Sequence, residues 1–491
     1  MARSAFRLLL LVGICSAGAP ALADDLRGAL EAAYRTNPSL QAARAGQRAT
    51  DEGVPIARAA GLPSLSGAAN YTEFVKKSAN SFTAPDRSFD ASINVSVPIY
   101  SGGAVKNSLL AAETRVDAGR ADLRGTESGV FSQVVAAYMD VILNQAVVGL
   151  RRGNVEVLTV NLQATSDRFQ IGDLTRTDVA QSQSRLSTAR SDLRSAQANL
   201  IASRERYIQA VGKVPVDLEP PPPLPGMPSS PDEATQVALD SNPDLIAARE
   251  RAKAAGIDVR TVSAARLPKV SIFTGAGYTD YLGTLGGSSS AGVFAQRQTT
   301  AQAGIRASIP IFQGGLPAAQ RRQAQAREGA ALEQEVGAQR EVIASVRAAF
   351  ASWQAAEEII TSNQTAVEAA TLSLEGVRAE NTVGNRTILD ILDAEQELLQ
   401  AQVRLVTARR NAYVAGFSLL AAMGKAEARD LGLDGGALYD PQSNYNRVRR
   451  AWSDWSNDPA PTVQSTRTVD TPAQNGSIQG QQAGPAGKSS P

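Results

Sequence analysis

The stretch VPIYSGG, from Val97 to Gly103, decides the fold because it returns as IPIFQGG from Ile309 to Gly315. The two copies lie 212 residues apart. The same step joins identical residues further along the chain: Gly172 with Gly384, Thr175 with Thr387, Asp178 with Asp390 and Gly212 with Gly424. Upstream, NPSL at 37–40 matches NPDL at 242–245. A match over so many positions indicates one structural unit present twice, rather than the short period of a solenoid.

The amino-terminal end predicts export. Arg3 and Arg7 precede an apolar run over residues 8–15, and Ala21-Leu22-Ala23 has the small residues of a cleavage site. This order is typical of a signal peptide, here residues 1–23. The run is too short to span a bilayer, and no later segment offers the roughly 20 continuous apolar residues that a membrane helix needs. We therefore expect a mature chain without a transmembrane helix.

The composition excludes most catalytic chemistry. Cys15, inside the signal peptide, is the only cysteine, and the chain has no histidine. Disulfides, thiolate nucleophiles, imidazole bases and nearly all transition-metal sites are thereby excluded. The phosphate-loop and nucleophile-elbow patterns are both absent. Nearly balanced charge and 5% aromatic residues give no case for nucleic-acid binding. We predict a protein that is not an enzyme and uses no metal or cofactor.

Two spans lack proline, from Pro98 to Pro215 and from Pro317 to Pro441, and are free to form long helices. Within them apolar or small residues recur at alternating steps of three and four: Leu186, Ala189, Leu193, Ala196 and Leu200. That spacing is the seam of a coiled coil. The many alanines predict close helix approach.

Each helical span is interrupted once, at Gly172 and at Gly384. Glycine followed by a turn-prone residue suits a helix end and a reversal of the chain. We therefore predict two long helical hairpins, at about 103–212 and about 315–424. The first arm of the first hairpin would be roughly 100 Å long at 1.5 Å per residue.

Before each hairpin the hydrophobic period changes to two, over 92–98 and 301–310, so that one face is apolar and the other polar. Partner strands upstream predict β-hairpins at about 63–99 and about 268–311. Such alternation fits a lipid-facing barrel, and on this pattern alone it fits a soluble β-sandwich equally well. Four strands cannot close a barrel, and open edges are not tolerated in lipid. If the strands are embedded, two, three or four chains must share one barrel.

These patterns divide the chain. The predicted parts are a signal peptide over 1–23, a first repeat over 24–212, a proline-rich linker over 213–231, a second repeat over 232–424, an equatorial-type segment over 425–456 and a disordered tail over 457–491. The tail is assigned from its Gln, Ser, Thr, Gly and Pro content.

The combined features resemble the TolC family of outer-membrane channels: the signal peptide, the duplicated NPxL helix, the paired strands, the P-I-[YF]-x-G-G motif and the long hairpin. The most specific piece is VGNRTILDILDAEQEL, from Val383 to Leu398, which resembles the start of the family's inner gating helix. The resemblance covers about 25–424. It implies an α+β membrane protein in the outer membrane of a Gram-negative bacterium. In a homotrimer, each protomer would give four strands to one barrel, which a coiled-coil tunnel continues across the periplasm.

The same resemblance implies a function and its partners. The chain would be a passive exit channel for an efflux pump or a type I secretion system. It would work with a periplasmic adaptor (membrane fusion) protein and an inner-membrane pump, in contact with outer-membrane lipid. The alternative from another class is a soluble periplasmic coiled-coil scaffold or adaptor protein.

By resemblance, Asp390 and Asp393 line the tunnel entrance as a pore constriction. Residues three apart share a helix face, and rings of acidic side chains favour cations. Without the resemblance, the pair would be an ordinary solvated helix face. Arg386 matches a gating arginine, with Thr177 and Asp178 as the partners that hold the tip closed.

The remaining predicted positions are structural. The sequence departs from the family at Asn381, where a tyrosine commonly joins the gate network. Gly172 and Gly384 mark the hairpin tips, where an adaptor would dock. The barrel-to-helix transition is assigned to Pro98, Gly102, Gly103, Pro310, Gly314 and Gly315.

One further cluster combines arginines with tryptophans: Arg447, Arg449, Arg450, Trp452 and Trp455. It could form a patch on a membrane surface. The interpretation we favour from the sequence is an ordinary packed and solvated segment around the tunnel.

Overall fold

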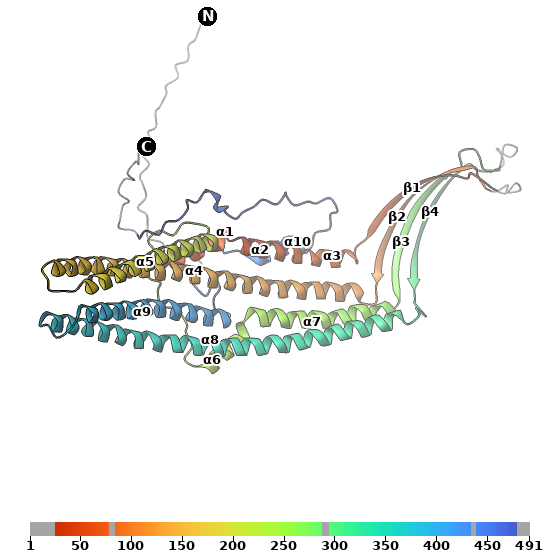
Figure 1. Ribbon diagram of the computed structural model, residues 1–491. Coiled ribbons are helices and arrows are strands. Elements are labelled where there is room, and N and C mark those ends of the chain that lie inside the picture. Colours follow the sequence, from red (N-terminus) through yellow and green to blue (C-terminus); the bar gives the residue numbers. More distant parts are fainter. Residues whose placement is uncertain (1–24, 78–83, 287–293, 434–437, 479–491) are drawn as a thin grey trace, which may run out of the picture.

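The computed structural model describes residues 25–77, 84–286, 294–433 and 438–478. Long helices lie side by side in a rod, and a curved four-stranded sheet extends from one end (Figure 1). Both helical hairpins turn at the end of the rod opposite the sheet. The expected order of helices, β-hairpin and long helical hairpin occurs in each half.

Short helices precede each β-hairpin. They are α1 (Leu26–Thr36), α2 (Pro38–Asp51) and α3 (Gly53–Ala59) in the first half, and α6 (Pro231–Ser241) and α7 (Pro243–Ser263) in the second. The repeated NPxL motif starts α2 and α7. Asn37 and Asn242 cap these helices with their side-chain oxygens, and proline occupies the first helical position. The motif leucines, Leu40 and Leu245, are fully buried.

The two asparagines also tie the short helices to the hairpins. The amide of Asn37 donates to the carbonyl of Ala210 at 3.0 Å, and that of Asn242 donates to the carbonyl of Ala422 at 2.8 Å. Each acceptor lies at the end of a hairpin's second arm. One asparagine therefore ends one helix, starts the next and fixes the hairpin base.

The hairpins are α4 (Ala104–Gln170) with α5 (Arg176–Val211), and α8 (Leu316–Thr382) with α9 (Ile388–Ala422). The first arms, α4 and α8, are both 67 residues long, which is about 100 Å at 1.5 Å per residue. The predicted seam of α5 is buried at Leu186, Ala189, Ala196 and Leu200, with Leu193 partly buried. Both first arms start near the sheet and have equal length. The two tips therefore lie at the same end of the rod.

The largest core lies midway along α4. Phe131, Tyr138, Leu200 and Tyr207 are fully buried there, and Phe417 of α9 joins them. By length and composition alone, α4 contains a stretch apolar enough to cross a membrane. The stretch is interrupted by Asp140, Asn144 and Gln145, so the expectation of no transmembrane helix stays a prediction. Residues 130–148 of α4 supply many of the buried core side chains, which accounts for this hydropathy.

The sheet contains β1 (Ser64–Glu73), β2 (Arg87–Tyr100), β3 (Lys269–Asp280) and β4 (Arg297–Ser308), in that order and antiparallel throughout. The predicted hairpin connections fall partly outside the described residues. The register places apolar residues in shared rows: Leu65 beside Val95, Val97 beside Ile272, and Ile272 beside Ile305. The other face is mostly polar, with Asn70 beside Asp90, and Ser96 beside Ser64.

The apolar face has the height of a membrane. On β2 it runs from Phe89 to Val97, a length of about 27 Å at about 3.4 Å per residue. Outer-membrane barrels carry an apolar band of about 25 Å. Within the part of the chain that the structure describes, each edge strand, β1 and β4, pairs with one neighbour only. The sheet therefore has a lipid-sized apolar face and two unpaired edges.

Glycines form the transition from strand to helix. Gly102, Gly103, Gly314 and Gly315 all have positive φ, from +58° to +85°. A Cβ on Gly102 would lie 2.6 Å from the Cβ of Leu267, so this turn also needs close approach. Pro98 lies in β2 at a register irregularity, where a missing N–H is tolerated, and Pro310 follows β4.

The predicted disordered tail, 457–491, lies partly outside the described residues, and its described part, 457–478, is mostly exposed but makes specific contacts with the helices. Beyond α10 (Pro441–Val448) the chain runs back along the helices (Figure 1). The guanidinium of Arg204 donates to the backbone carbonyl of Asn475 at 2.6 Å, and Ile478 packs against the main core. Arg204 is 7% exposed, and burial lowers its pKa. A buried cation needs acceptors, and the tail supplies them.

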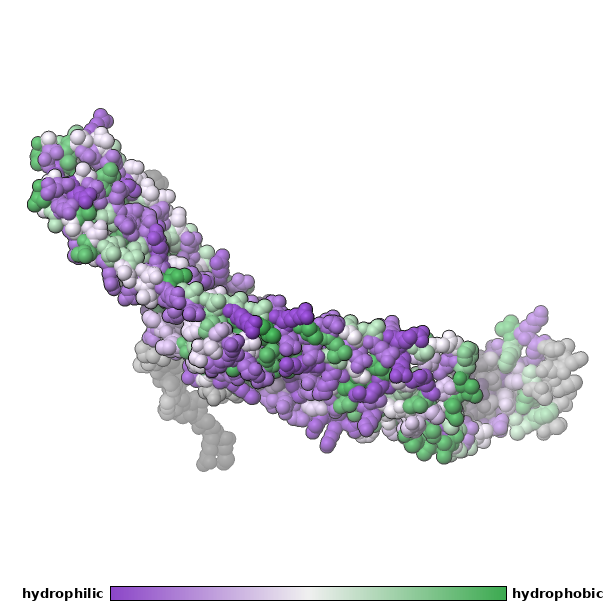
Figure 2. All heavy atoms as spheres, turned by 90° about the horizontal axis from the view of Figure 1, so that it is seen from below, coloured by the Kyte–Doolittle hydropathy of each residue, from purple (hydrophilic) through white to green (hydrophobic). Residues whose placement is uncertain are grey.

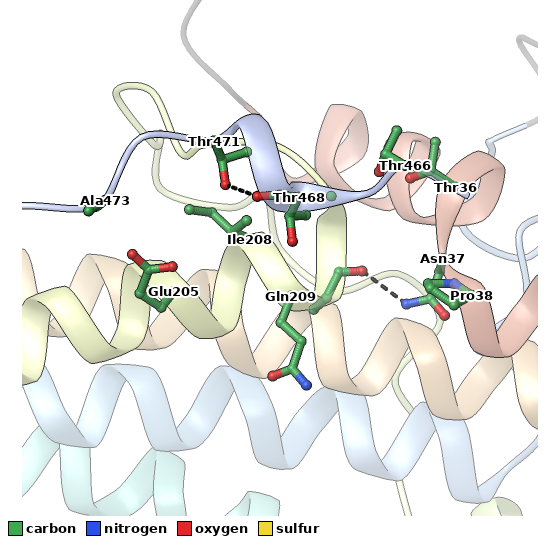
Figure 3. Close-up of a pocket in the computed structure, with 12 residues that line it drawn as sticks. Thr36, Asn37, Pro38, Glu205, Ile208, Gln209, Thr466, Thr468, Thr471 and Ala473 are labelled. Carbon is green, nitrogen blue, oxygen red and sulfur yellow. Dashed lines mark hydrogen bonds between the residues drawn. The ribbon is translucent and has the colours of Figure 1, made fainter. Parts of the chain in front are cut away.

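Between this tail and the ends of α1 and α5 is a cavity of about 580 Å³. Thr466, Thr468 and Thr471 of the tail line one side, and Glu205 and Gln209 of α5 line the other (Figure 3).

We predict that Gly424→Ala destabilises the fold more than Gly384→Ala. Both glycines have positive φ, +72° and +84°, which costs an L-residue about 1–2 kcal/mol. A Cβ on Gly424 would also lie 2.5 Å from the backbone oxygen of Ser241, whereas one on Gly384 has open space. Overpacking adds typically about 1–3 kcal/mol. Guanidinium midpoints from circular dichroism measure the difference, and equal midpoints would contradict the close approach of Gly424 to Ser241 at the hairpin base.

Candidate functional site

Both hairpin tips close through glycine. Gly172 and Gly384 have φ of +83° and +84°, and a Cβ on either would meet no atom within 4 Å. In the first tip the N–H of Asp173 bonds the carbonyl of Arg168, and in the second the N–H of Asn385 bonds that of Glu380. These are the backbone bonds of a glycine C-cap. The glycines are therefore required by conformation, and the tips project into open space.

Each second arm starts with the same capping box. The hydroxyl of Thr387 accepts from the N–H of Asp390, whose carboxylate accepts from the backbone N–H of Thr387 at 2.8 Å. Thr175 and Asp178 form the same box in the first hairpin. Hydrogen bonds from the threonine hydroxyl, and then from its backbone N–H, hold the pKa of both aspartates below the ordinary 3.8. Asp390 is therefore ionised and also fixed as a helix cap.

The gate residues do not meet within one chain. Arg386 donates to Glu380 at 2.7 Å and lies 3.9 Å from Asp390. Thr177 is exposed on the other tip, and Asp178 is held by its cap. The departure at Asn381 has a local role, because its amide donates to the carbonyl of Arg386 at 2.7 Å and closes the tip.

Each tip carries one ion pair across its turn, and the order of the two charges along the chain is reversed between the tips. Arg168 pairs with Asp173 at 2.7 Å in the first tip, and Glu380 pairs with Arg386 at 2.7 Å in the second. Arg168 and Glu380 occupy equivalent positions of the repeat, one step of 212 residues apart. The hairpins are thus alike in backbone and reversed in charge.

Asp393 joins the two hairpins. Its carboxylate accepts from the guanidinium of Arg185 on α5 at 2.5 Å, and its side chain stays 57% exposed. Beside this pair, Leu186 and Leu392 are buried against each other in a small cluster with Leu158. The predicted second carboxylate of the constriction therefore has a positive partner in its own protomer.

Glu395 is the other link near the tips. It is 7% exposed, and it accepts from Asn161 of α4 at 3.1 Å and from Arg378 of α8 at 3.0 Å. Sequence reasoning missed Glu395 and Arg185. Glu395 stands three positions after Leu392 and four before Leu399, and a charged residue on the same helix face as two leucines was a usable signal. Arg185 gave none, because its partner lies 208 residues away. Among the described residues no group of three or more metal-ligating side chains occurs.

Comparison with known proteins identifies the family to which this chain belongs. The family described as "Outer membrane efflux protein" matches residues 29–213 and 234–425, which is most of the chain and both repeats. The chain belongs to the outer membrane efflux protein family. The TolC-like resemblance and the fold of barrel strands with a helical tunnel are confirmed.

Individual relatives agree with the family. This efflux protein is 34% identical to the outer membrane efflux protein BepC of Brucella suis over 90% of this chain and 94% of BepC. It is 26% identical to outer membrane protein TolC of Escherichia coli over 94% and 96% of the two chains. The structure of VceC from Vibrio cholerae superposes with a TM-score of 0.70 at 23% identity, covering 81% and 96%. The similarity to VceC shows the fold alone.

The relatives support an outer-membrane exit channel, and they do not support the soluble scaffold. This efflux protein is located in the outer membrane, with its helices in the periplasm. Its family consists of channels and not of enzymes.

Capping by Asp390 should make the second tip sensitive to acid. Because the folded pKa is lowered, the stabilisation is present above the ordinary 3.8 and is lost as the pH falls through the folded value. We expect hydrogen-exchange protection in the first turn of α9 to fall in acid. Thr387→Ala should abolish this dependence, because the cap is already lost. Thr365→Ala, at an exposed site within α8, is the control. Unchanged protection in acid would contradict the capping role.

Proposed function

We propose that three copies of this chain form one channel through the outer membrane. Each copy contributes β1 to β4 to a twelve-stranded barrel, and the helical hairpins form the tunnel below it. The observation that carries this proposal is the open sheet, which has a lipid-sized apolar face and two unpaired edges. An unpaired backbone group in hydrocarbon costs several kcal/mol, so the edges must pair between copies.

The polar sheet face would line the water-filled lumen. It carries Asp90, Asn94 and Arg306, with the Arg306 guanidinium 4.8 Å from the ring centroid of Phe273. Phe273 also fills the space above Gly304, where a Cβ would lie 3.0 Å from the ring. Polar residues inward and apolar residues outward are the arrangement of a barrel channel.

The constriction would lie at the hairpin tips. Asp390 and Asp393 are one turn apart on α9, and a threefold axis would repeat them as two stacked rings. Such rings favour cations. Arg386 is exposed, as is Thr177, so a neighbouring copy could bring Arg386 to Thr177 and Asp178 as a gate. A wet ion pair contributes only about 0.2–1 kcal/mol, so a docking partner could open such a gate.

Docking and energy would come from partners. The tips at Gly172 and Gly384, where an added Cβ would meet no atom within 4 Å, would receive a periplasmic adaptor protein, itself joined to an inner-membrane pump. The chain carries no phosphate-loop pattern, so the pump would supply the energy. Cargo would be small molecules or an unfolded secreted protein.

Ion selectivity in planar bilayers tests the constriction. We expect cation selectivity in the unmodified channel and a lower cation-to-anion permeability ratio in the double variant Asp390→Asn/Asp393→Asn. Arg185→Gln removes the positive partner of Asp393 and should raise the ratio. Arg151→Gln, which breaks the pair with Asp192 inside the first hairpin, is the matched control.

The possible results test the channel proposal and the constriction proposal separately. If the aspartate variant conducts with unchanged selectivity, the constriction is assigned to the wrong residues and the channel stands. A folded, membrane-inserted protein that never conducts would overturn the channel itself.

Cross-linking tests the shared barrel. The mature chain lacks cysteine, so one can be placed on β1 at Gly67 and another on β4 at one of Thr299, Ala301 or Ala303. Within a chain, β1 and β4 are three strand spacings apart, about 14 Å, too far for a disulfide. Oxidation should therefore link different copies, in a ladder that ends at three chains. Pairs placed on the central strands β2 and β3 should link within one chain. A ladder that ends at two or four chains would refute the trimer.

A further inference from the structure

Two tryptophans near the carboxyl terminus are almost fully exposed. Trp452 is 83% exposed and Trp455 is 93% exposed. The sequence analysis favoured a packed and solvated segment, and in the single chain these two side chains are solvated. We call residues 449–457 the tryptophan loop. Trp353, the third tryptophan of the chain, is partly buried against Phe350 and serves as an internal comparison.

The tryptophan loop lies close to the base of the sheet. α10, which leads to it, runs beside α2 and α3 in their direction. Asn444 bonds Asp51 at 2.8 Å, and the carbonyl of Arg449 accepts from Arg58 at 3.3 Å. Arg58 is in the last turn of α3, six residues before β1 begins at Ser64. The path from Asn444 to Arg449 therefore leads towards the strands (Figure 1).

The loop is closed at its own base. Arg447, just before it, forms a bidentate pair with Asp458, just after it, at 2.8 and 2.9 Å. The chain thus leaves the helical surface after Val448, carries the two tryptophans, and returns. Tyr445 packs against the same small cluster as Leu109, which is five residues into α4, about 8 Å from the start of that helix at 1.5 Å per residue.

Exposed apolar side chains also occur on the other edge of the sheet, at its base. Ile309, Ile311, Phe312 and Leu316 are 64%, 96%, 87% and 54% exposed where β4 leads into α8. Figure 2 shows hydrophobic residues gathered where the helices meet the sheet, with further hydrophobic residues at the tip end and a mixed surface between them. The lower limit of the membrane should therefore lie at this level.

The loop has the chemistry of a lipid headgroup site. Tryptophan prefers the membrane–water interface, because its ring is apolar and its indole N–H is polar. Arg449 and Arg450 are exposed, and within the loop only Asp454 opposes them. Exposed arginines suit the phosphates of phospholipids.

We infer that the tryptophan loop inserts Trp452 and Trp455 into the headgroup region of the periplasmic leaflet around the base of the barrel. The occupant of this surface is phospholipid. Insertion sets the depth of the barrel, because Arg447, Asp458, Arg58 and Asn444 tie the loop to the helical tunnel. The inference rests on the proposed barrel, and it adds a membrane contact made by the helical part of the chain.

Fluorescence quenching by labelled lipid tests this inference. The full-length protein with Trp353→Phe keeps only the two loop tryptophans. It is placed in phosphatidylcholine vesicles containing some phosphatidylglycerol, with a nitroxide either on the headgroup or at the end of the acyl chain. We expect the headgroup nitroxide to remove most of the emission and the acyl-end nitroxide to remove little. Acrylamide should quench the vesicle-bound protein less than the protein in detergent.

The matched control is Trp452→Phe/Trp455→Phe, which keeps Trp353 inside the helical rod and should respond to neither nitroxide. Emission that acrylamide quenches fully in vesicles, and that no nitroxide affects, would overturn the inference. So would protection from acrylamide only after an adaptor protein is added, because the occupant would then be protein. Conductance of the same vesicles keeps the tests separate: a conducting preparation with water-exposed loop tryptophans refutes only the lipid contact.

Discussion

Backbone hydrogen bonding in lipid is the constraint on which the rest of this structure depends. β2 and β3 each have two neighbours, whereas β1 and β4 each have one. In water the free edges would bond to solvent, but in hydrocarbon each unpaired group costs several kcal/mol. Over the 10 residues of β1 and the 12 of β4, no side-chain contact could offset that cost. Assembly and insertion are therefore coupled, and the isolated chain is an incomplete barrel.

The duplicated helices follow from the same constraint. A closed barrel fixes the height at which every strand leaves the membrane, so the helices below must all begin at one level. The repeated glycine turns provide this, because they set the same geometry at the starts of α4 and α8. With α4 and α8 of equal length, both tips then reach the same end of the rod, where the proposed constriction would lie.

What the sequence could predict was decided by how far apart the interacting residues lie. The boxes at Thr175 and Thr387, the strand faces and the glycine reversals involve partners within a few residues or a simple period, and all were accessible. The pair Arg185 and Asp393 spans 208 residues and could not be read from any pattern. The tail has the composition of a disordered segment, yet the buried Arg204 holds it through Asn475. The composition of a segment does not show whether a distant buried group, such as the Arg204 guanidinium, will take its hydrogen-bond acceptors from that segment.

The two halves agree at the base and differ at the tips, and the difference has a physical reason. At the base both halves meet the same backbone demands, so the same Asn, Pro and Gly recur. At the tips, the trimer proposal gives the two hairpins of one copy non-equivalent places around a threefold axis. Arg168 is replaced by Glu380 at the equivalent position, and Gln181 stands where the second half has Asp393. Under the trimer proposal, this reversal lets one hairpin bring carboxylates to the axis while the other supplies Arg185 to hold one of them. Charge divergence between the repeats would then distinguish the inner hairpin from the outer one, although both are built on the same backbone.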